Sequence, residues 1–115
     1  MAMLEHLTQQ IQTHPMIVYM KGTPQFPQCG FSGQVAHILN TSGAKYAYVN
    51  VLANPEVRRL LPQVANWPTF PQLYIQGELV GGCDIITELY EQGELQKMLE
   101  AAELVTEKAE FIAAE

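Results

Sequence analysis

The chain has 115 residues, the size of one ordinary domain. Its net charge of −6 argues against nucleic acid or an anionic membrane surface as the main partner, because both need basic patches. Apolar residues make up 48% of the chain, which is too many for a disordered protein, and no apolar run approaches the roughly 18 residues of a membrane-spanning helix.

The first elements are a helix and a strand. Apolar residues between positions 4 and 11 have the spacing of one helix face, and Pro15 ends that helix. The continuous apolar run 16–20 is typical of a strand buried on both faces. Residues 21–28 contain one glycine and two prolines, which predict a loop.

The middle of the chain repeats this alternation. A second apolar helix face begins at Phe31, and Gly43 suits the position just past the end of that helix. Residues 46–51 have the composition of a strand. The segment 54–56 (Asn-Pro-Glu) is typical of a helix start, and we expect Pro62 to limit the length of that helix.

The last third begins with a proline-rich stretch, 67–71, that is too irregular for a helix or strand. Residues 72–75 and 78–81 are predicted to form a hairpin around the turn 76–77. Two helices follow, separated by Gly93.

This order of elements indicates the α/β class. A strand–helix–strand unit requires a right-handed crossover and parallel strands, and the hairpin adds antiparallel ones. We therefore expect one domain over residues 1–103, with a small four-stranded mixed sheet flanked by helices on both faces. Residues 104–115 form an acidic tail rich in Ala and Glu, which we expect to be helical or disordered.

Charge is unevenly distributed along the chain. Residues 78–115 carry ten acidic and two basic side chains, whereas residues 1–77 carry four basic and two acidic ones. The first two thirds therefore offer the better place for a small anion. The N-terminus shows no cationic segment followed by an apolar stretch, so we expect no secretory signal and a cytoplasmic location.

The chain has two cysteines, Cys29 and Cys83, which are too few for a disulfide-scaffolded domain. They also cannot form a four-ligand metal site within one chain, so a soft metal would need a second chain or an outside thiol. The histidines, His6, His14 and His37, have no partner at metal-ligand spacing, and we expect them at the surface.

Cys29 lies between a proline-containing loop and the first turn of a predicted helix. Free amides and the helix dipole favour a thiolate there, and a cysteine pKa near 8.5 falls to roughly 3.5–7.5 in such places. Lys21, just upstream, would add a positive charge. The alternative is a buried structural cysteine, but the flanking Pro27, Gln28 and Gly30 favour an exposed turn.

The motif from Cys29 to Ser32 is C-x-x-S. In a C-x-x-C motif the second thiol resolves a mixed disulfide, and Ser32 cannot do this because a hydroxyl is a poor nucleophile at neutral pH. Dithiol disulfide reduction by this motif is therefore excluded. Monothiol exchange with an external thiol and thiolate–metal ligation remain open.

Four sequence blocks, at residues 21–24, 27–32, 67–72 and 81–84, closely resemble those of the monothiol (CGFS-type) glutaredoxins. The resemblance implies a thioredoxin-like fold and a glutathione site. It also implies a homodimer that shares one 2Fe–2S cluster, held by the active-site cysteine of each protomer and the thiols of two glutathiones. The implied function is cluster storage and transfer between iron–sulfur donor and acceptor proteins, often with a BolA-like partner.

Ligand counting leaves two versions of such a cluster site. Iron–sulfur clusters commonly take four thiolates, and a dimer supplies two Cys29 sulfurs. The other two ligands would be glutathione thiols or, in an all-protein version, the two Cys83 residues.

The family pattern implies which residues contact glutathione. Lys21 and Arg58 are the expected partners of its glycine carboxylate, although Arg58 is alternatively a solvated charge on a helix face. Phe70 and Pro71 occupy the family's cis-proline position, where the Phe70 backbone would pair with the tripeptide like an added strand. Thr69 is expected to support this turn and to face the active-site cysteine.

The segment Gly82-Cys83-Asp84 opens a helix whose free N–H groups suit the γ-glutamyl carboxylate, while the Asp84 carboxylate would take the ammonium group. Asp84 is alternatively a helix N-cap. Cys83 is alternatively a small buried residue or a resolving thiol for Cys29. Trp67 is expected to pack beside the site.

We therefore expect an iron–sulfur carrier, with Cys29 as cluster ligand, rather than a turnover enzyme. The alternative is a glutathione-dependent thiol transferase, in which Cys29 attacks a mixed disulfide and free glutathione resolves it. A third hypothesis is a regulatory adaptor whose groove docks a partner and whose acidic tail sets selectivity.

Overall fold

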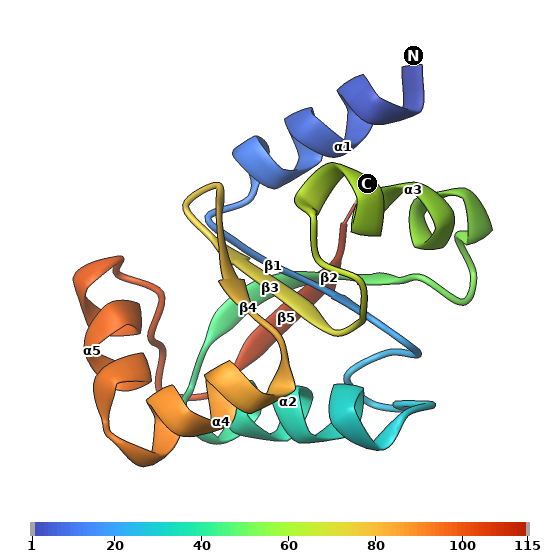
Figure 1. Ribbon diagram of the computed structural model, residues 1–115. Helices are drawn as coiled ribbons and strands as arrows, with labels where there is room; N and C mark the ends of the chain where they lie inside the picture. Colours follow the sequence, from blue (N-terminus) through green and yellow to red (C-terminus); the bar gives the residue numbers. More distant parts are fainter. Residues whose placement is uncertain (1, 115) are drawn as a thin grey trace.

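A computed structural model describes residues 2–114, and Met1 and Glu115, the outer limits of the predicted domain and tail, lie outside the described residues. The described helices are α1 (Ala2–Thr13), α2 (Gly30–Thr41), α3 (Pro55–Ala65), α4 (Cys83–Glu91) and α5 (Glu94–Ala101). The described strands are β1 (Met16–Met20), β2 (Lys45–Asn50), β3 (Gln72–Ile75), β4 (Glu78–Gly81) and β5 (Glu110–Ala113). They form one mixed sheet in the order β4-β3-β1-β2-β5 (Figure 1).

Helices cover both faces of this sheet, as predicted for the α/β class. α1 and α3 lie on one face, and α2 and α4 lie on the other, with α5 beside α4 (Figure 1). One apolar cluster, which includes Val18 and Leu39, packs between the sheet and the α2–α4 layer. A second cluster, which includes Ile17 and Leu61, packs beneath α1 and α3.

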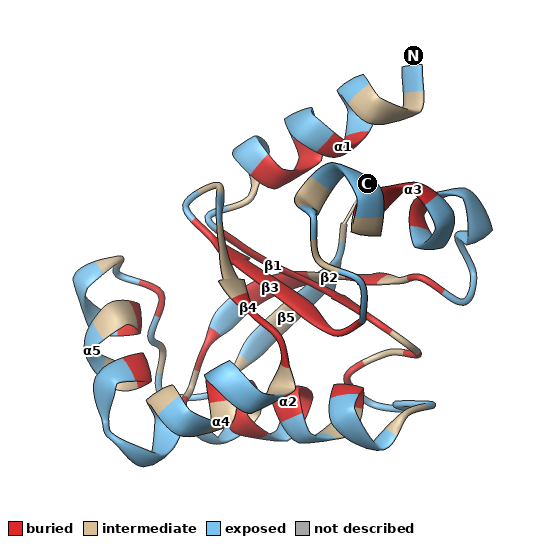
Figure 2. Cartoon of the chain, viewed as in Figure 1, coloured by how far each residue is buried: buried red, intermediate tan, exposed pale blue. Residues whose placement is uncertain are grey.

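β1 is the central strand of the sheet, and all five of its residues are buried (Figure 2). It pairs in parallel with β2 and antiparallel to β3. Because helices cover both of its faces, its sequence is continuously apolar rather than alternating. The carboxyl ends of β1 and β2 open toward the loops that precede α2 and α3, and ligands of open α/β sheets bind at this edge.

The tail departs from the prediction. The sheet has five strands instead of four, because residues 110–113, expected to be helical or disordered, form β5 in parallel with β2. Phe111 lies with its ring centroid 5.7 Å from that of Tyr46 and 6.1 Å from that of Tyr48. Burial of this aromatic ring against β2 anchors an edge strand that the local composition does not predict.

Two smaller expectations are also wrong. Phe31 is 62% exposed instead of lying on the buried face of α2. Pro62 lies inside α3, which continues to Ala65, so it removes one helical N–H without ending the helix. The other predicted helices and strands lie within one or two residues of their expected bounds. Among residues 2–114, no helix combines the length and apolarity needed to span a bilayer.

Candidate functional site

A groove of about 680 Å³ lies at the carboxyl end of β1, between the starts of α2 and α4, α3 and the loop 67–71. All eight residues that the sequence predicts for the site line it, namely Lys21, Cys29, Arg58, Thr69, Phe70, Pro71, Cys83 and Asp84. They come from segments far apart in the chain. The fold therefore brings the predicted constellation together around one cavity.

Cys29 occupies the N-cap position of α2, with extended backbone angles and a half-buried side chain. The backbone N–H of Ser32 is the largest influence and lowers the pKa of the Cys29 thiol, while burial opposes it. The N–H of Phe31, the Ser32 hydroxyl and the Lys21 charge lower this pKa further. The net pKa is below that of an ordinary cysteine, so the geometry favours a thiolate facing the groove.

Ser32 is fully buried, and its hydroxyl serves both as a hydrogen-bond acceptor and as a donor. Its Oγ accepts a hydrogen bond of 3.0 Å from the backbone N–H of Lys21, which leaves its own hydroxyl proton available to Cys29. The serine that replaces a resolving thiol therefore ties the end of β1 to the first turn of α2. Its hydroxyl also stabilises the Cys29 thiolate, although it cannot resolve a mixed disulfide formed there.

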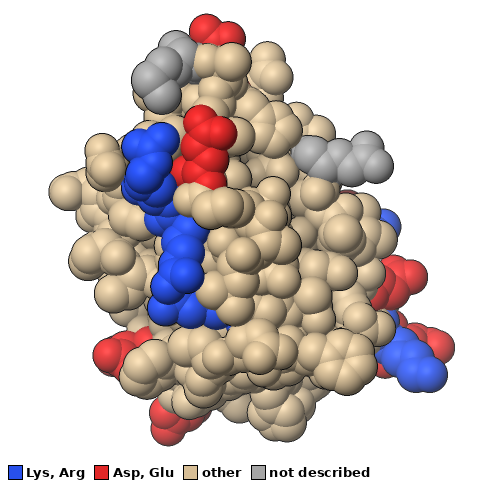
Figure 3. All heavy atoms as spheres, turned by 90° about the vertical axis from the view of Figure 1, so that its right-hand side faces the viewer, with Lys and Arg blue, Asp and Glu red and all other residues tan. Residues whose placement is uncertain are grey.

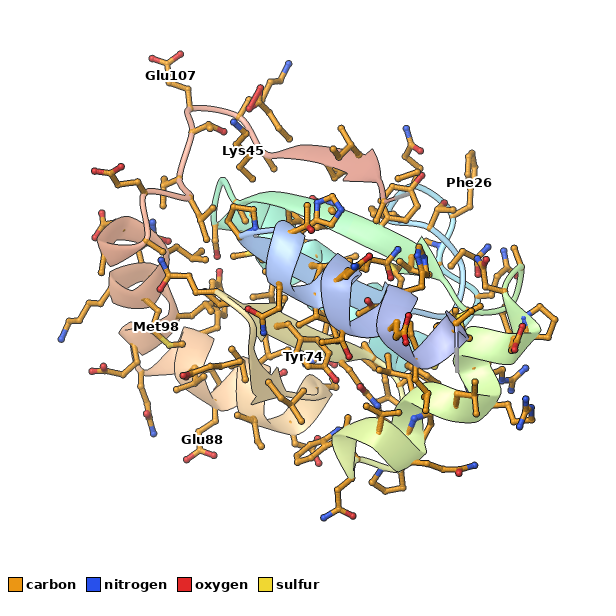
Figure 4. All side chains as sticks on the ribbon, turned by 90° about the horizontal axis from the view of Figure 1, so that it is seen from above. Phe26, Lys45, Tyr74, Glu88, Met98 and Glu107 are labelled. Atoms are coloured by element: carbon orange, nitrogen blue, oxygen red, sulfur yellow. The ribbon has the colours of Figure 1, made fainter. Side chains whose placement is uncertain are left out.

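The conformation of the loop before Cys29 depends on Gly22 and on the side-chain amide of Asn50. Gly22 has φ of +97°, and a Cβ there would lie 2.6 Å from Gln28 N and Phe26 O, so only glycine fits. The side chain of Asn50 accepts a 2.9 Å bond from the Gly22 N–H. These contacts hold Lys21 beside the groove, while Phe26 points into solvent at the loop tip (Figure 4).

Arg58 lies on α3 and lines the groove from the side opposite α4, whereas Arg59 does not line it. Figure 3 shows a band of Lys and Arg side chains on the side of the molecule that carries α3. α3 begins at Pro55, as predicted, but Asn54 makes no side-chain cap bond and instead donates from Nδ2 to Asn50 O at 2.9 Å. Lys21 and Arg58 make the groove suitable for a carboxylate.

The loop 67–71 forms another wall. The Phe70–Pro71 peptide bond is cis, as the family resemblance implies. Among residues 2–114, the backbone N–H groups of Thr69 and Phe70 donate to no protein acceptor, so they are available to a ligand. The indole Nε1 of Trp67 is also buried with no protein partner among those residues.

The start of α4 packs closely against this loop. A Cβ at Gly82 would lie 3.2 Å from Pro71 O and 3.4 Å from Trp67 Nε1, so this position has little room for a larger residue. Gly82, and not Asp84, is the N-cap of α4, which leaves the Asp84 carboxylate exposed on the first turn. Cys83 is half-buried, and its Sγ lies 3.9 Å from Thr87 Oγ1.

Comparison of the sequence with known proteins identifies one family. The glutaredoxin family profile covers residues 16–80, more than half of the chain. Glutaredoxin 4 of Escherichia coli (strain K12) is 52% identical over 96 residues, which cover 84% of each chain. The chain belongs to the glutaredoxin family. A probable monothiol glutaredoxin of Legionella pneumophila is 56% identical over 86 residues, 75% of this chain and 97% of that protein, and the C-x-x-S motif places this chain in the same monothiol group.

Solved glutaredoxin structures have the same fold. Reduced apo GrxS14 from poplar superposes with a TM-score of 0.74 at 46% identity, over 88% of this chain and 93% of that one. A buckwheat glutaredoxin–glutathione complex superposes with a TM-score of 0.77 at 24% identity, over 90% and 92% of the two chains. The thioredoxin-like fold implied by the sequence is confirmed.

The sequence does not predict a positioning role for three polar residues that shape the groove of this glutaredoxin. Ser32, Asn50 and Gln72 each bond a backbone atom of a groove loop. The sequence signal for them is weak: Asn50 ends β2, Gln72 begins β3 and Ser32 lies in the first turn of α2, and each is a polar residue close to a loop in which glycine or proline disrupts regular backbone pairing. Such a residue is a candidate partner for the loop's orphaned polar groups.

Proposed function

We propose that the groove binds glutathione and that this monothiol glutaredoxin carries a 2Fe–2S cluster between two protomers. The observation that carries the proposal is the placement of a thiolate-favouring Cys29 at a groove with two cations and unpaired backbone donors. Glutathione offers two carboxylates, one ammonium, one thiol and two peptide units. Each of these groups has a chemical counterpart in the groove.

The counterparts suggest one orientation of the tripeptide. The glycine carboxylate faces Lys21 and Arg58, and the cysteine backbone pairs with the free N–H and the C=O of Phe70. The γ-glutamyl carboxylate meets the first N–H groups of α4, and the ammonium meets Asp84. This orientation leaves the glutathione sulfur beside Cys29. The structural similarity to a buckwheat glutaredoxin solved with glutathione supports the proposal.

The cluster is cargo that one chain cannot hold alone. Among residues 2–114, no group of three or more His, Cys, Asp or Glu side chains is placed to bind a metal. Each protomer offers the Cys29 thiolate, and a bound glutathione would supply a second thiolate, so a homodimer reaches the usual four ligands. A ligand set that includes a free tripeptide favours transfer to iron–sulfur acceptors, from donors or with a BolA-like partner, in the reducing cytoplasm.

Anaerobic reconstitution tests this proposal. Protein mixed with iron, sulfide and glutathione should become a coloured dimer, and omission of glutathione should prevent this. The Cys83→Ser variant separates the two ligand sets, because retention of the cluster excludes Cys83 as a ligand. A colourless monomer with reduced Cys29, in the presence of glutathione, would overturn the cluster proposal.

Thiol transfer is the second candidate, favoured by the lowered pKa of Cys29. The Cys29 thiolate would attack the glutathione sulfur of a glutathionylated protein, releasing the protein thiolate and forming a Cys29–glutathione disulfide. A second glutathione thiolate would then restore Cys29 and release oxidised glutathione. Fast steady-state turnover of a small glutathione mixed disulfide would favour thiol transfer over cluster carriage as the main function.

A further inference from the structure

Gln72 is a fully buried amide at the first position of β3, directly after the groove loop 67–71. Its Nε2 donates to two backbone carbonyls of that loop, Trp67 O at 3.0 Å and Thr69 O at 3.2 Å. Its Oε1 accepts from the hydroxyl of Tyr74 at 2.9 Å. Both Nε2 protons and one side of the carbonyl oxygen are therefore used inside the protein.

The loop depends on these bonds because it has few of its own. Pro68 and Pro71 have no N–H, and the N–H groups of Thr69 and Phe70 donate to no protein atom among residues 2–114. The described backbone bond at its start runs from Trp67 N to Pro62 O at 3.0 Å. The Gln72 amide thus connects the inward-facing carbonyls of the loop to the rigid central sheet.

The amide itself is fixed by its surroundings. Gln72 and Tyr74 are two residues apart on one strand, so their side chains share a face of the sheet. The Tyr74 ring packs edge-on against Tyr19, with ring centroids 5.8 Å apart. A buried amide oriented by a packed tyrosine has little freedom to rotate, so it fixes the loop in one conformation.

We propose that Gln72 is a positioning residue for tripeptide binding: by pulling the Trp67 and Thr69 carbonyls inward, it keeps the intervening loop turned so that the Phe70 N–H faces the groove. The ligand class is a peptide that pairs with this loop like an added strand. The inference rests on the proposed glutathione site. Gln72 does not line the groove, so it acts on the ligand through the loop.

The test compares Gln72→Met with Tyr19→Phe, using reduced glutathione and calorimetry on the full chain. Methionine keeps the length and approximate volume of the side chain but cannot donate to the carbonyls. Tyr19→Phe removes another buried bond of the same region, from the Tyr19 hydroxyl to Gln10 Oε1 at 2.6 Å, without touching the loop. We expect Gln72→Met to raise the glutathione Kd about tenfold and Tyr19→Phe to change it less than about twofold.

A second readout separates positioning from general damage. The groups that lower the pKa of Cys29 lie on α2 and at Lys21, so the pH profile of Cys29 alkylation should be the same in Gln72→Met and in the parent protein. If Gln72→Met does not fold, Gln72→Asn replaces it, since asparagine keeps a buried amide but is too short to reach both carbonyls. It should raise the Kd about threefold or more.

The outcomes distinguish a failure of the glutathione site from a failure of the positioning role of Gln72. A parent protein that does not bind glutathione overturns the glutathione site and, with it, this inference. A parent that binds while the Gln72 variant binds equally well overturns the inference alone. Equal weakening by Tyr19→Phe, or a shifted alkylation profile in Gln72→Met, assigns the effect to lost stability and likewise overturns the positioning role.

Discussion

The groove loops and the C-terminal tail both lie at the periphery of the same sheet, but different forces hold them. The groove loops are fixed by single polar side chains, Ser32, Asn50 and Gln72, each bonded to backbone atoms. The tail is fixed by strand pairing to β2 and by the aromatic ring of Phe111. Changes in the groove should therefore alter chemistry and affinity, whereas changes in the tail should alter stability.

The largest expected effect is that of Cys29→Ser. Loss of the sulfur should abolish glutathione-dependent cluster retention and dimer formation, because a serine hydroxyl does not replace a thiolate ligand. At a pH below the folded pKa of Cys29, stability should be unchanged or slightly higher, since the side chain is half-buried and serine is a favourable N-cap residue. Iron content and thermal melting of the reconstituted variant measure both. A variant that still retains iron would show that Cys29 is not the ligand.

The matching change in the tail is Phe111→Ala. It removes a half-buried ring that contacts Tyr46 and Tyr48, and it should lower the free energy of unfolding by about 2 kcal/mol. Because no residue of β5 lines the groove, the glutathione Kd should stay within about twofold of the parent value. Urea denaturation and calorimetry measure the two quantities, and a weakened Kd would contradict the separation of the two regions.

The same contrast explains what the sequence predicts and what it does not. The position of Cys29 follows from its neighbours, a loop with glycine and prolines followed by a helix start, whereas the glutathione-contacting residues and the cis Phe70–Pro71 bond follow from the resemblance of four short sequence blocks to the monothiol glutaredoxins. Such short blocks are visible in a single sequence, and the glycines and prolines in them restrict the local backbone. The elements from α1 to α5 follow from the apolar spacing of the helices, the continuous apolar run of β1, and the turn residues that separate the elements.

β5 and Gln72 depend on contacts between distant parts of the chain. The segment Glu110–Ala113 has two large apolar residues, and it becomes a strand because Phe111 meets aromatic residues of β2 far upstream. Gln72 is a polar residue in a strand, and its partners are defined only when the loop has folded over it. For Phe31 the local pattern itself is misleading. Its position fits the apolar spacing of a helix face, but the side chain is exposed on the first turn of α2.

A smaller effect is expected at the basic side of the groove. Arg58→Ala should raise the glutathione Kd about three- to tenfold, because an exposed charge-assisted contact to a carboxylate contributes only modestly. Arg59→Ala is the matched control, since this neighbour on α3 has the same charge but does not line the groove. The difference should shrink as the salt concentration is raised. Equal effects of the two substitutions would indicate general electrostatic attraction rather than a specific contact.

The smallest expected effect, that of Ser32→Ala, separates chemistry from stability within the groove itself. Removing the hydroxyl takes away one of the groups that lower the pKa of Cys29, while the backbone N–H groups of Ser32 and Phe31 remain. The pKa should therefore rise, yet stay below that of an ordinary cysteine. The pH profile of iodoacetamide alkylation should move to higher pH, and Thr87→Ala, which removes a hydroxyl beside Cys83, should leave it in place.

The lowered pKa of Cys29 also makes the free energy of unfolding depend on pH. A thiol whose pKa is lower in the folded state stabilises that state fully above the unfolded pKa, and this contribution is lost as the pH falls through the folded pKa. Ser32→Ala also leaves the Lys21 N–H without its side-chain acceptor, a cost that does not depend on pH. The stability difference between the parent and the variant should therefore grow as the pH rises through the folded pKa of Cys29 in the parent, and level off above its folded pKa in the variant, which is still below the ordinary value of about 8.5. A difference independent of pH would mean that Ser32 holds the loop without supporting the thiolate.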